Sequence, residues 1–175
     1  FQAEDGIRDI GVTGVQTCAL PIFEEAVLGE LMLERDALTS VIDILHPESF
    51  YKDAHQRIFA AIRRLFEKSE PIDILTVTNE LKHSAELDIV GGPFYITQLT
   101  NRVASAANIE FHSRIILQKH IQRELIRISS ETIKDSFEDT SDVFSLLDKA
   151  EKNLYDIAQG NIKRNFRDKI GRAHV

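Results

Sequence analysis

The sequence predicts an all-α fold, in which a small N-terminal helical bundle is followed by a long antiparallel helical hairpin. Apolar residues recur every three or four positions through most of the chain, which is the period of an amphipathic helix. The best candidate for a strand, residues 87–90, is bounded by Gly91 and Gly92 and is too short to nucleate a sheet. The stretch from Ala107 to Phe137 contains no glycine or proline and is therefore predicted as one long helix.

Length and composition are those of one soluble domain. The chain has 175 residues, 43% hydrophobic and 28% charged, with only 4 prolines and 8 glycines, which excludes disorder and a collagen-like fold. No apolar run approaches the roughly 18 residues needed to cross a bilayer. The formal net charge of -7 repels phosphate backbones, which disfavours a stand-alone DNA-binding protein. The single cysteine, Cys18, cannot form an internal disulfide, so the cytoplasm is the expected compartment.

The predicted bundle, residues 23–105, begins with two amphipathic helices. The first carries Gly29 in its middle, which we expect to mark a close helix crossing rather than an end. Pro47 ends the second, because the residue before a proline avoids the α region. Their apolar stripes are Phe23, Ala26, Val27 and Leu31, then Leu38, Val41, Ile42 and Leu45.

Caps and breaks predict the rest of the bundle. We expect Asp53 to cap a helix that ends before Pro71, and Thr76 to open the next one. Gly91 and Gly92 form a break before Pro93, and proline suits the first turn of a helix. The apolar positions of these helices are Ile58, Phe59, Ile62, Leu65, Phe66, Val77, Leu81, Phe94, Ile96, Leu99 and Val103.

The predicted hairpin, residues 106–160, connects the long helix to a second one through a turn at residues 137–141. The second helix has apolar residues spaced 4, 3, 4 and 3 apart, a heptad seam that we expect the long helix to cover. Apolar residues beside that seam then need another chain, which predicts oligomerisation, although packing back onto the bundle fits the periodicity equally well. The seam comprises Val143, Leu147, Ala150, Leu154 and Ile157. Its expected partners in the long helix are Ile121, Leu125 and Ile128, and the residues beside it are Phe144, Leu146 and Tyr155.

The sequence carries no catalytic, cofactor-binding or metal-binding motif. A phosphate-cradling loop needs glycines followed by Lys and Ser or Thr, whereas Gly91-Gly92 precedes Pro93. There is no His-Glu-x-x-His, no pair of Glu-x-x-His motifs and, outside Cys18, no cysteine ligand. His55 and His112 are predicted as capping or core residues rather than ligands. Basic and acidic residues alternate, which favours a solvated face over a nucleic-acid stripe.

Both ends of the chain resemble translated sequencing-adapter sequence. Residues 12–22 resemble a codon-for-codon translation of an indexed sequencing-library adapter, and residues 170–175 resemble a translation of its complementary strand. We therefore expect residues 1–22 and 169–175 to be artefactual and poorly packed, with residues 161–168 as the start of a linker. A natural flexible tail is the alternative interpretation.

Five segments also occur in an order and at spacings known from one protein family. They are 26–33, 47–59, 71–78, 90–96 and 106–112, with Arg123-Glu124-Leu125-Ile126 in the long helix fitting as well. Together they resemble the N-terminal region of bacterial replicative DNA helicases of the DnaB family. The resemblance covers Phe23 to about Gly160.

The resemblance implies a collar domain that assembles into a hexamer, often as a trimer of dimers, and helps bind primase and possibly a helicase loader. It implies that ATP, magnesium and the catalytic residues belong to a C-terminal domain outside this chain, and that single-stranded DNA is bound only by the full-length ring. Two alternatives from other classes are an independent all-α enzyme and a helix-turn-helix DNA-binding protein. The absence of clustered ionisable side chains argues against the first, and the acidic balance against the second.

Overall fold

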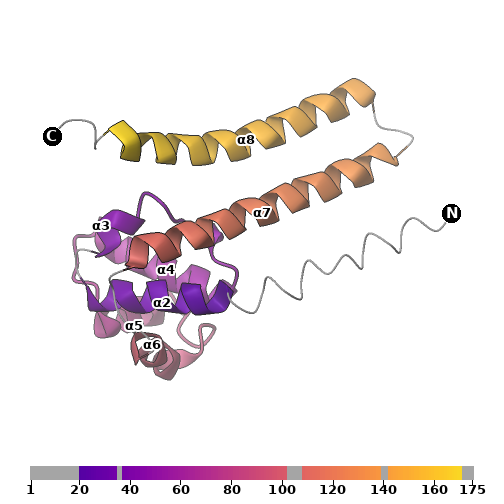
Figure 1. Cartoon of the computed structure of the whole chain (residues 1–175). Helices are drawn as coiled ribbons and strands as arrows, with labels where there is room; N and C mark the ends of the chain where they lie inside the picture. The colour runs from indigo at the N-terminus through magenta and orange to yellow at the C-terminus, as the bar shows by residue number, and fades with distance from the viewer. Residues whose placement is uncertain (1–19, 35–36, 102–107, 139–141, 171–175) are drawn as a thin grey trace. The chain divides into compact units, whose positions relative to one another are not determined.

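The described part of the chain consists of helices and the turns that connect them (Figure 1). The computed structural model describes residues 20–34, 37–101, 108–138 and 142–170, with side chains described up to residue 159. Within these ranges there is no strand, so the predicted all-α fold is confirmed. The elements are α2 Leu20–Leu33, α3 Ala37–Val41, η1 Pro47–Ser49, α4 Asp53–Glu67, α5 Ile74–His83, α6 Gly92–Asn101, α7 Ile109–Ser136 and α8 Val143–Ile170.

The chain forms two compact units that divide inside α7. The first unit is Phe1–Leu117 and the second is Gln118–Val175. This division lies later in the chain than the boundary predicted at residues 105 and 106. The first turns of α7 belong with the bundle because they bury Ile109, Ser113 and Ile116.

Helix α2 is the central element of the first unit. It packs against α6, α4 and α3, and α4 in turn packs against α5. Val27, Leu28 and Leu31 of α2 are buried, and the rings of Phe50 and Phe59 contact each other with centroids 5.0 Å apart. Each large side chain buried in this way contributes about 1.5 to 3 kcal/mol, so α2 holds the other helices in place.

Helix α2 begins at Leu20, inside the segment expected to be artefactual and poorly packed. Leu20 is only 5% exposed, so the expectation of poor packing is wrong for this residue, whereas Ile22 is 65% exposed. Pro21 is compatible with this start because the first backbone N–H groups of a helix have no intrahelical acceptor. Residues 1–19 and 171–175, on which the rest of that expectation falls, lie outside the described residues.

Two helix starts differ from the sequence prediction. Asp53 is the first residue of α4 rather than its cap, and Lys52 occupies the cap position. Helix α5 begins before Thr76, because the Asp73 side chain accepts hydrogen bonds from the backbone N–H groups of Leu75 and Thr76 at 2.8 and 2.9 Å. The backbone N–H of Asp73 donates in turn to the Thr76 hydroxyl oxygen at 2.9 Å, which completes a capping box.

The break before α6 is formed as predicted. Gly91 and Gly92 both have positive φ, 100° and 75°, a conformation that side chains with a Cβ adopt rarely. A Cβ at Gly91 would also lie 3.2 Å from Cβ of Tyr95, so a glycine lets α6 place Tyr95 close to the turn.

The second unit contains the end of α7 and the whole of α8, which run antiparallel. Asp142 begins α8 by accepting hydrogen bonds from the Ser145 hydroxyl and backbone N–H at 2.9 and 3.1 Å, which hold the pKa of Asp142 below its usual value. Helix α8 continues through residues 161–168, where the sequence analysis placed the start of a linker. These residues include neither glycine nor proline, so nothing in the local sequence stops the helix.

Candidate interaction surface

One face of α8 is apolar and exposed. Phe144 is 76% and Val143 72% exposed, and Leu147, Leu154 and Tyr155 are exposed as well. At about 100° per residue these five side chains share an arc of roughly 120° on the helix. An exposed apolar stripe of this size is typical of a surface that binds another molecule.

A neighbouring side of α8, next to the apolar stripe on the helix surface, faces α7. Leu146, Ala150, Asn153 and Ile157 are less exposed than the apolar stripe, and they repeat every three or four residues. On the same side, Lys149 Nζ lies 2.6 Å from a carboxylate oxygen of Asp135 in α7.

The predicted seam of α8 is correct for Ala150 and Ile157, which lie on the less exposed side, and wrong for its other three residues. Val143, Leu147 and Leu154 were expected to lie inside the hairpin but are exposed, whereas Leu146 was expected to need another chain but is half-buried. Both rows have heptad spacing, so periodicity alone does not distinguish them. Of the residues predicted beside the seam, Phe144 and Tyr155 are exposed as expected.

The predicted partner positions in α7 differ in burial. Ile128 is buried, Ile121 is half-buried and Leu125 is exposed. Three more exposed apolar residues lie outside the predicted interface: Ile126 and Ile133 on α7, and Phe137 directly after its end. Their spacing of seven and four residues is the signal that would have identified them.

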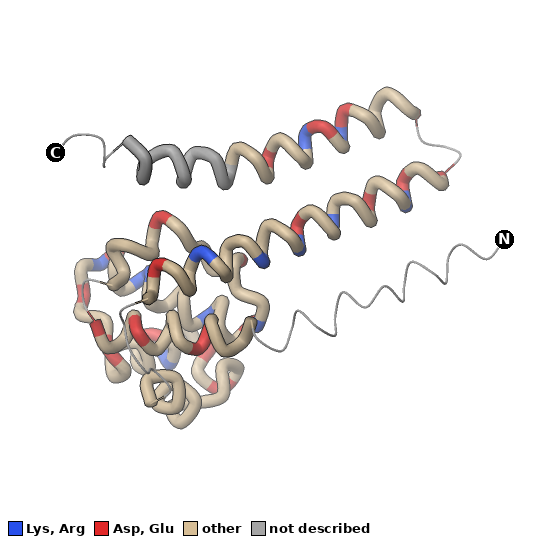
Figure 2. Tube along the Cα trace, viewed as in Figure 1, with Lys and Arg blue, Asp and Glu red and all other residues tan. Residues whose placement is uncertain are grey.

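Arg127 forms ion pairs along α7. Arg127 lies 2.9 Å from Glu124 and 2.8 Å from Glu131, one turn to either side. Its hydrogen bond holds the pKa of Glu124 below the usual value and, reciprocally, raises the pKa of Arg127. Figure 2 shows basic and acidic residues interspersed along α7 and along the coloured part of α8.

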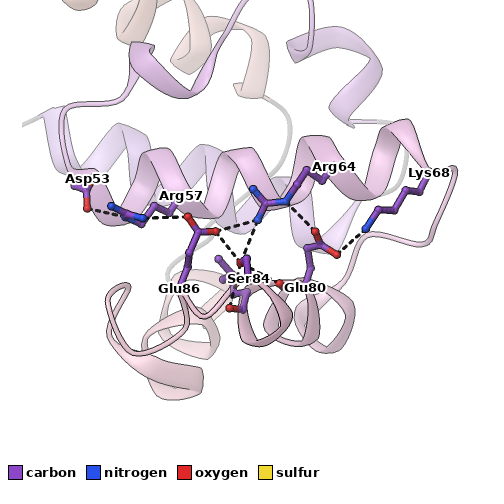
Figure 3. Close-up of polar contacts among 8 residues, drawn as sticks. Asp53, Arg57, Arg64, Lys68, Glu80, Ser84 and Glu86 are labelled. Atoms are coloured by element: carbon purple, nitrogen blue, oxygen red, sulfur yellow. Dashed lines mark hydrogen bonds and ion pairs between the residues drawn. The ribbon is translucent and has the colours of Figure 1, made fainter.

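A second network of ion pairs lies on the bundle, between α4 and the segment from α5 to Glu86 (Figure 3). Arg64 contacts Glu80 at 2.8 Å and Glu86 at 3.0 Å, and Arg57 contacts Glu86 at 3.0 Å. The hydrogen bonds from Lys68 and then Arg64 lower the pKa of Glu80. Burial acts to raise the pKa of Glu86, but hydrogen bonds from Ser84, Arg64 and Arg57 outweigh it and lower the pKa.

The bundle also contains a buried polar chain that links three helices. His55 in α4 is fully buried, with Nδ1 at 2.6 Å from Glu24 of α2 and Nε2 at 2.7 Å from the hydroxyl of Tyr95 in α6. The Glu24 carboxylate also accepts the backbone N–H groups of Tyr51 and Lys52. These contacts confirm that His55 is a satisfied core residue, because every polar atom of its ring has a partner inside the fold.

The described residues contain no group of three or more His, Cys, Asp or Glu side chains arranged to hold a metal ion. Nor does that part of the chain include a helix long and apolar enough to cross a membrane.

The described residues form an all-α domain. Its buried polar groups connect helices, and one face of α8 is an exposed apolar surface. Residues 20–118 match the profile of the family described as "DnaB-like helicase N terminal domain". The chain belongs to this family. The match begins at Leu20, the residue at which α2 begins.

Relatives over most of the chain are replicative DNA helicases. The Replicative DNA helicase DnaB of Rhodothermus marinus is 41% identical over 144 residues, which cover 82% of this chain and 15% of that protein. The Replicative DNA helicase DnaC of Bacillus subtilis is 40% identical over 136 residues, covering 78% of this chain and 30% of that protein. This chain thus spans less than a third of the length of either relative.

Solved structures agree with the fold. The N-terminal domain of DnaB helicase from Mycobacterium tuberculosis superposes with a TM-score of 0.74 at 32% identity, covering 78% of this chain and 96% of that one. A DnaB-like replicative helicase, whose structure was described together with its interactions with primase, superposes with a TM-score of 0.65 at 22% identity. That match covers 87% of this chain and 35% of the other, and at this identity it supports the fold alone.

Proposed function

We propose that this chain is the assembly domain of a cytoplasmic replicative DNA helicase, which joins copies of itself into a collar and recruits primase. The observation that carries the proposal is the apolar stripe of α8, formed by Val143, Phe144, Leu147, Leu154 and Tyr155, in a chain of the DnaB N-terminal domain family. We expect the stripe to be covered by the hairpin of another copy.

The energetics favour such a contact. Burying each large apolar side chain of the stripe contributes about 1.5 to 3 kcal/mol, and Phe144, Leu147 and Leu154 are all available for burial. Part of this gain offsets the cost of association, so a weak to moderate dimer of the isolated chain is the expected result.

Sedimentation analysis of a double variant, Phe144→Ser with Leu147→Ser, tests the proposal. We expect wild-type chain to form dimers or larger assemblies at micromolar concentration and the variant to be largely monomeric, with unchanged helicity by circular dichroism. Leu75→Ser is the matched control, because Leu75 is 79% exposed but lies on the bundle, and it should leave association unchanged.

Wild-type chain that stays monomeric up to ~100 μM would contradict the self-association proposal. At that concentration a contact worth only ~5.5 kcal/mol already populates the dimer. Equal loss of association in Leu75→Ser would instead place the interface on the bundle.

Recruitment of primase is a separate part of the proposal and has a separate measurement. It is supported by family membership and by the described primase interactions of the DnaB-like helicase named above. Titration of labelled chain with the primase of a close relative should give saturable binding, measured by fluorescence anisotropy. Absence of binding by an assembled wild-type sample would contradict recruitment and leave the assembly role intact.

A further inference from the structure

The carboxylate of Glu30 in α2 is buried close to the first turns of α7. Glu30 in α2 is 1% exposed, and its Oε2 has no partner among the described residues. Its Oε1 lies 3.9 Å from Nδ1 of His112 in α7, which is too long for a hydrogen bond. Nδ1 of His112 and the hydroxyl of Ser113 are likewise buried without a partner. All three residues belong to the first compact unit.

Burial changes the acidity of this group. Desolvation, with a smaller contribution from the negative charge of Glu34, raises the pKa of Glu30 to about 7. Glu30 therefore exchanges its proton within the ordinary range of pH for a protein in solution.

Among the described residues, no lysine or arginine forms an ion pair with Glu30. Helix α3 has no titratable residue, and α6 has only Tyr95, whose hydroxyl is bound to His55. From α4 and its cap, His55 and Lys52 contact the other two acidic residues of α2, Glu24 and Glu25. In α7, Arg114 lies 2.6 Å from Glu110. The α7 side chain that faces Glu30 is His112, at 3.9 Å.

We propose that Glu30 and His112 form a proton-controlled latch that fastens the first turns of α7 to α2. With a proton on Glu30 its buried carboxyl group carries no charge and is compatible with burial between the two helices. Loss of that proton leaves a buried carboxylate without a donor, which is costly unless water enters or the helices separate. The attachment of α7 to the bundle is then tight at mildly acidic pH and looser at mildly alkaline pH.

Amide hydrogen exchange tests the latch. Protection factors for residues 109–117 should fall roughly tenfold between about pH 6 and about pH 8, after correction for the intrinsic exchange rate, if opening returns Glu30 to its ordinary acidity.

Three variants make the test specific. Glu30→Gln should abolish the pH dependence at residues 109–117. Glu34→Gln should move the change to lower pH, because the negative charge that disfavours ionisation of Glu30 is removed. Glu48→Gln, at an exposed site on η1, should behave as wild type.

Two results would overturn the latch. One is an undiminished pH dependence at residues 109–117 in Glu30→Gln. The other is a Glu30 carboxyl that titrates at its ordinary value in wild-type chain by carbon-13 NMR, a measurement that needs no variant to fold.

Discussion

Glu24 and Glu30 are buried carboxylates in the same helix, but their surroundings differ. Glu24 accepts hydrogen bonds from two backbone N–H groups and contacts His55, whereas Glu30 has no hydrogen-bond partner among the described residues. A buried carboxylate that accepts hydrogen bonds from several segments holds those segments together. Without donors, the ionised form of a buried carboxylate is unfavourable, and protonation removes this cost. Helix α2 thus carries one carboxylate that holds neighbouring segments in place and another whose pKa is raised by burial.

Replacing Glu24 should weaken the bundle strongly. Glu24→Ala leaves the N–H groups of Tyr51 and Lys52 and the ring of His55 without their acceptor, for a loss of about 3 to 5 kcal/mol in the free energy of unfolding. Urea denaturation gives this value. Glu67→Ala, which removes an exposed pair with Arg63, is the control and should cost less than about 1 kcal/mol. Equal losses in the two variants would contradict the structural role of Glu24.

Glu30→Gln should change how stability depends on pH. Because the pKa of Glu30 rises from 4.5 to about 7 on folding, its protonated form contributes stability that is complete below pH 4.5 and is lost as the pH rises towards 7. The variant lacks this loss, so its stability relative to wild type should increase by roughly 3 kcal/mol between acidic and alkaline pH. Denaturation at several pH values measures the difference, and a difference independent of pH would refute the assignment.

At the scale of elements, α5 depends on its first turn. Asp73 accepts two backbone hydrogen bonds there, so Asp73→Ala should cost about 1 kcal/mol in the free energy of unfolding. Asp43→Ala, at an exposed position outside a helix, provides the control. Thermal denaturation compares them, and an unchanged melting temperature in Asp73→Ala would show that the capping box contributes nothing.

The register of α8 illustrates how two rows compete on one helix. Val143, Leu147 and Leu154 are the more apolar row, but the row of Leu146, Ala150, Asn153 and Ile157 is the less exposed one. A helix that packs on α7 and also carries an exposed stripe has two apolar sides. Spacing identifies both sides but not which one the same chain covers.

For the whole molecule, we expect no ATP hydrolysis. The sequence between Phe23 and Asp168 has no phosphate-cradling loop, and the chain matches only the N-terminal domain of its helicase relatives. With magnesium and ATP, phosphate release should equal that of a buffer blank. Turnover that co-purifies with the chain and disappears in a His112 variant would favour the enzyme alternative instead.

Salt should affect self-association only weakly. The proposed contact is apolar, and screening also relieves the repulsion between chains of formal net charge -7. The dissociation constant from sedimentation should therefore stay constant or decrease slightly as salt rises to a moderate concentration. A steep weakening with salt would instead indicate an interface held by ion pairs such as those of Arg127.

The features that the sequence determined by itself depend on residues that are close together in the chain. Helix period, proline and glycine breaks and short motifs depend on residues close together in the chain, so the all-α class, the break before α6, the long α7 and the family were all predicted from them. Even there, the start of α2 was misplaced, because the burial of Leu20 depends on the folded bundle.

Tertiary structure decided which polar and apolar groups are covered. The satisfied Glu24, the unpartnered Glu30 and the exposed side of α8 depend on helices brought together from distant parts of the chain. Desolvation and packing act through space rather than along the sequence, so residues of the same type in one helix acquire different roles. In this protein the local sequence determined the helices, and their packing determined which residues hold the bundle together and which face of α8 stays exposed.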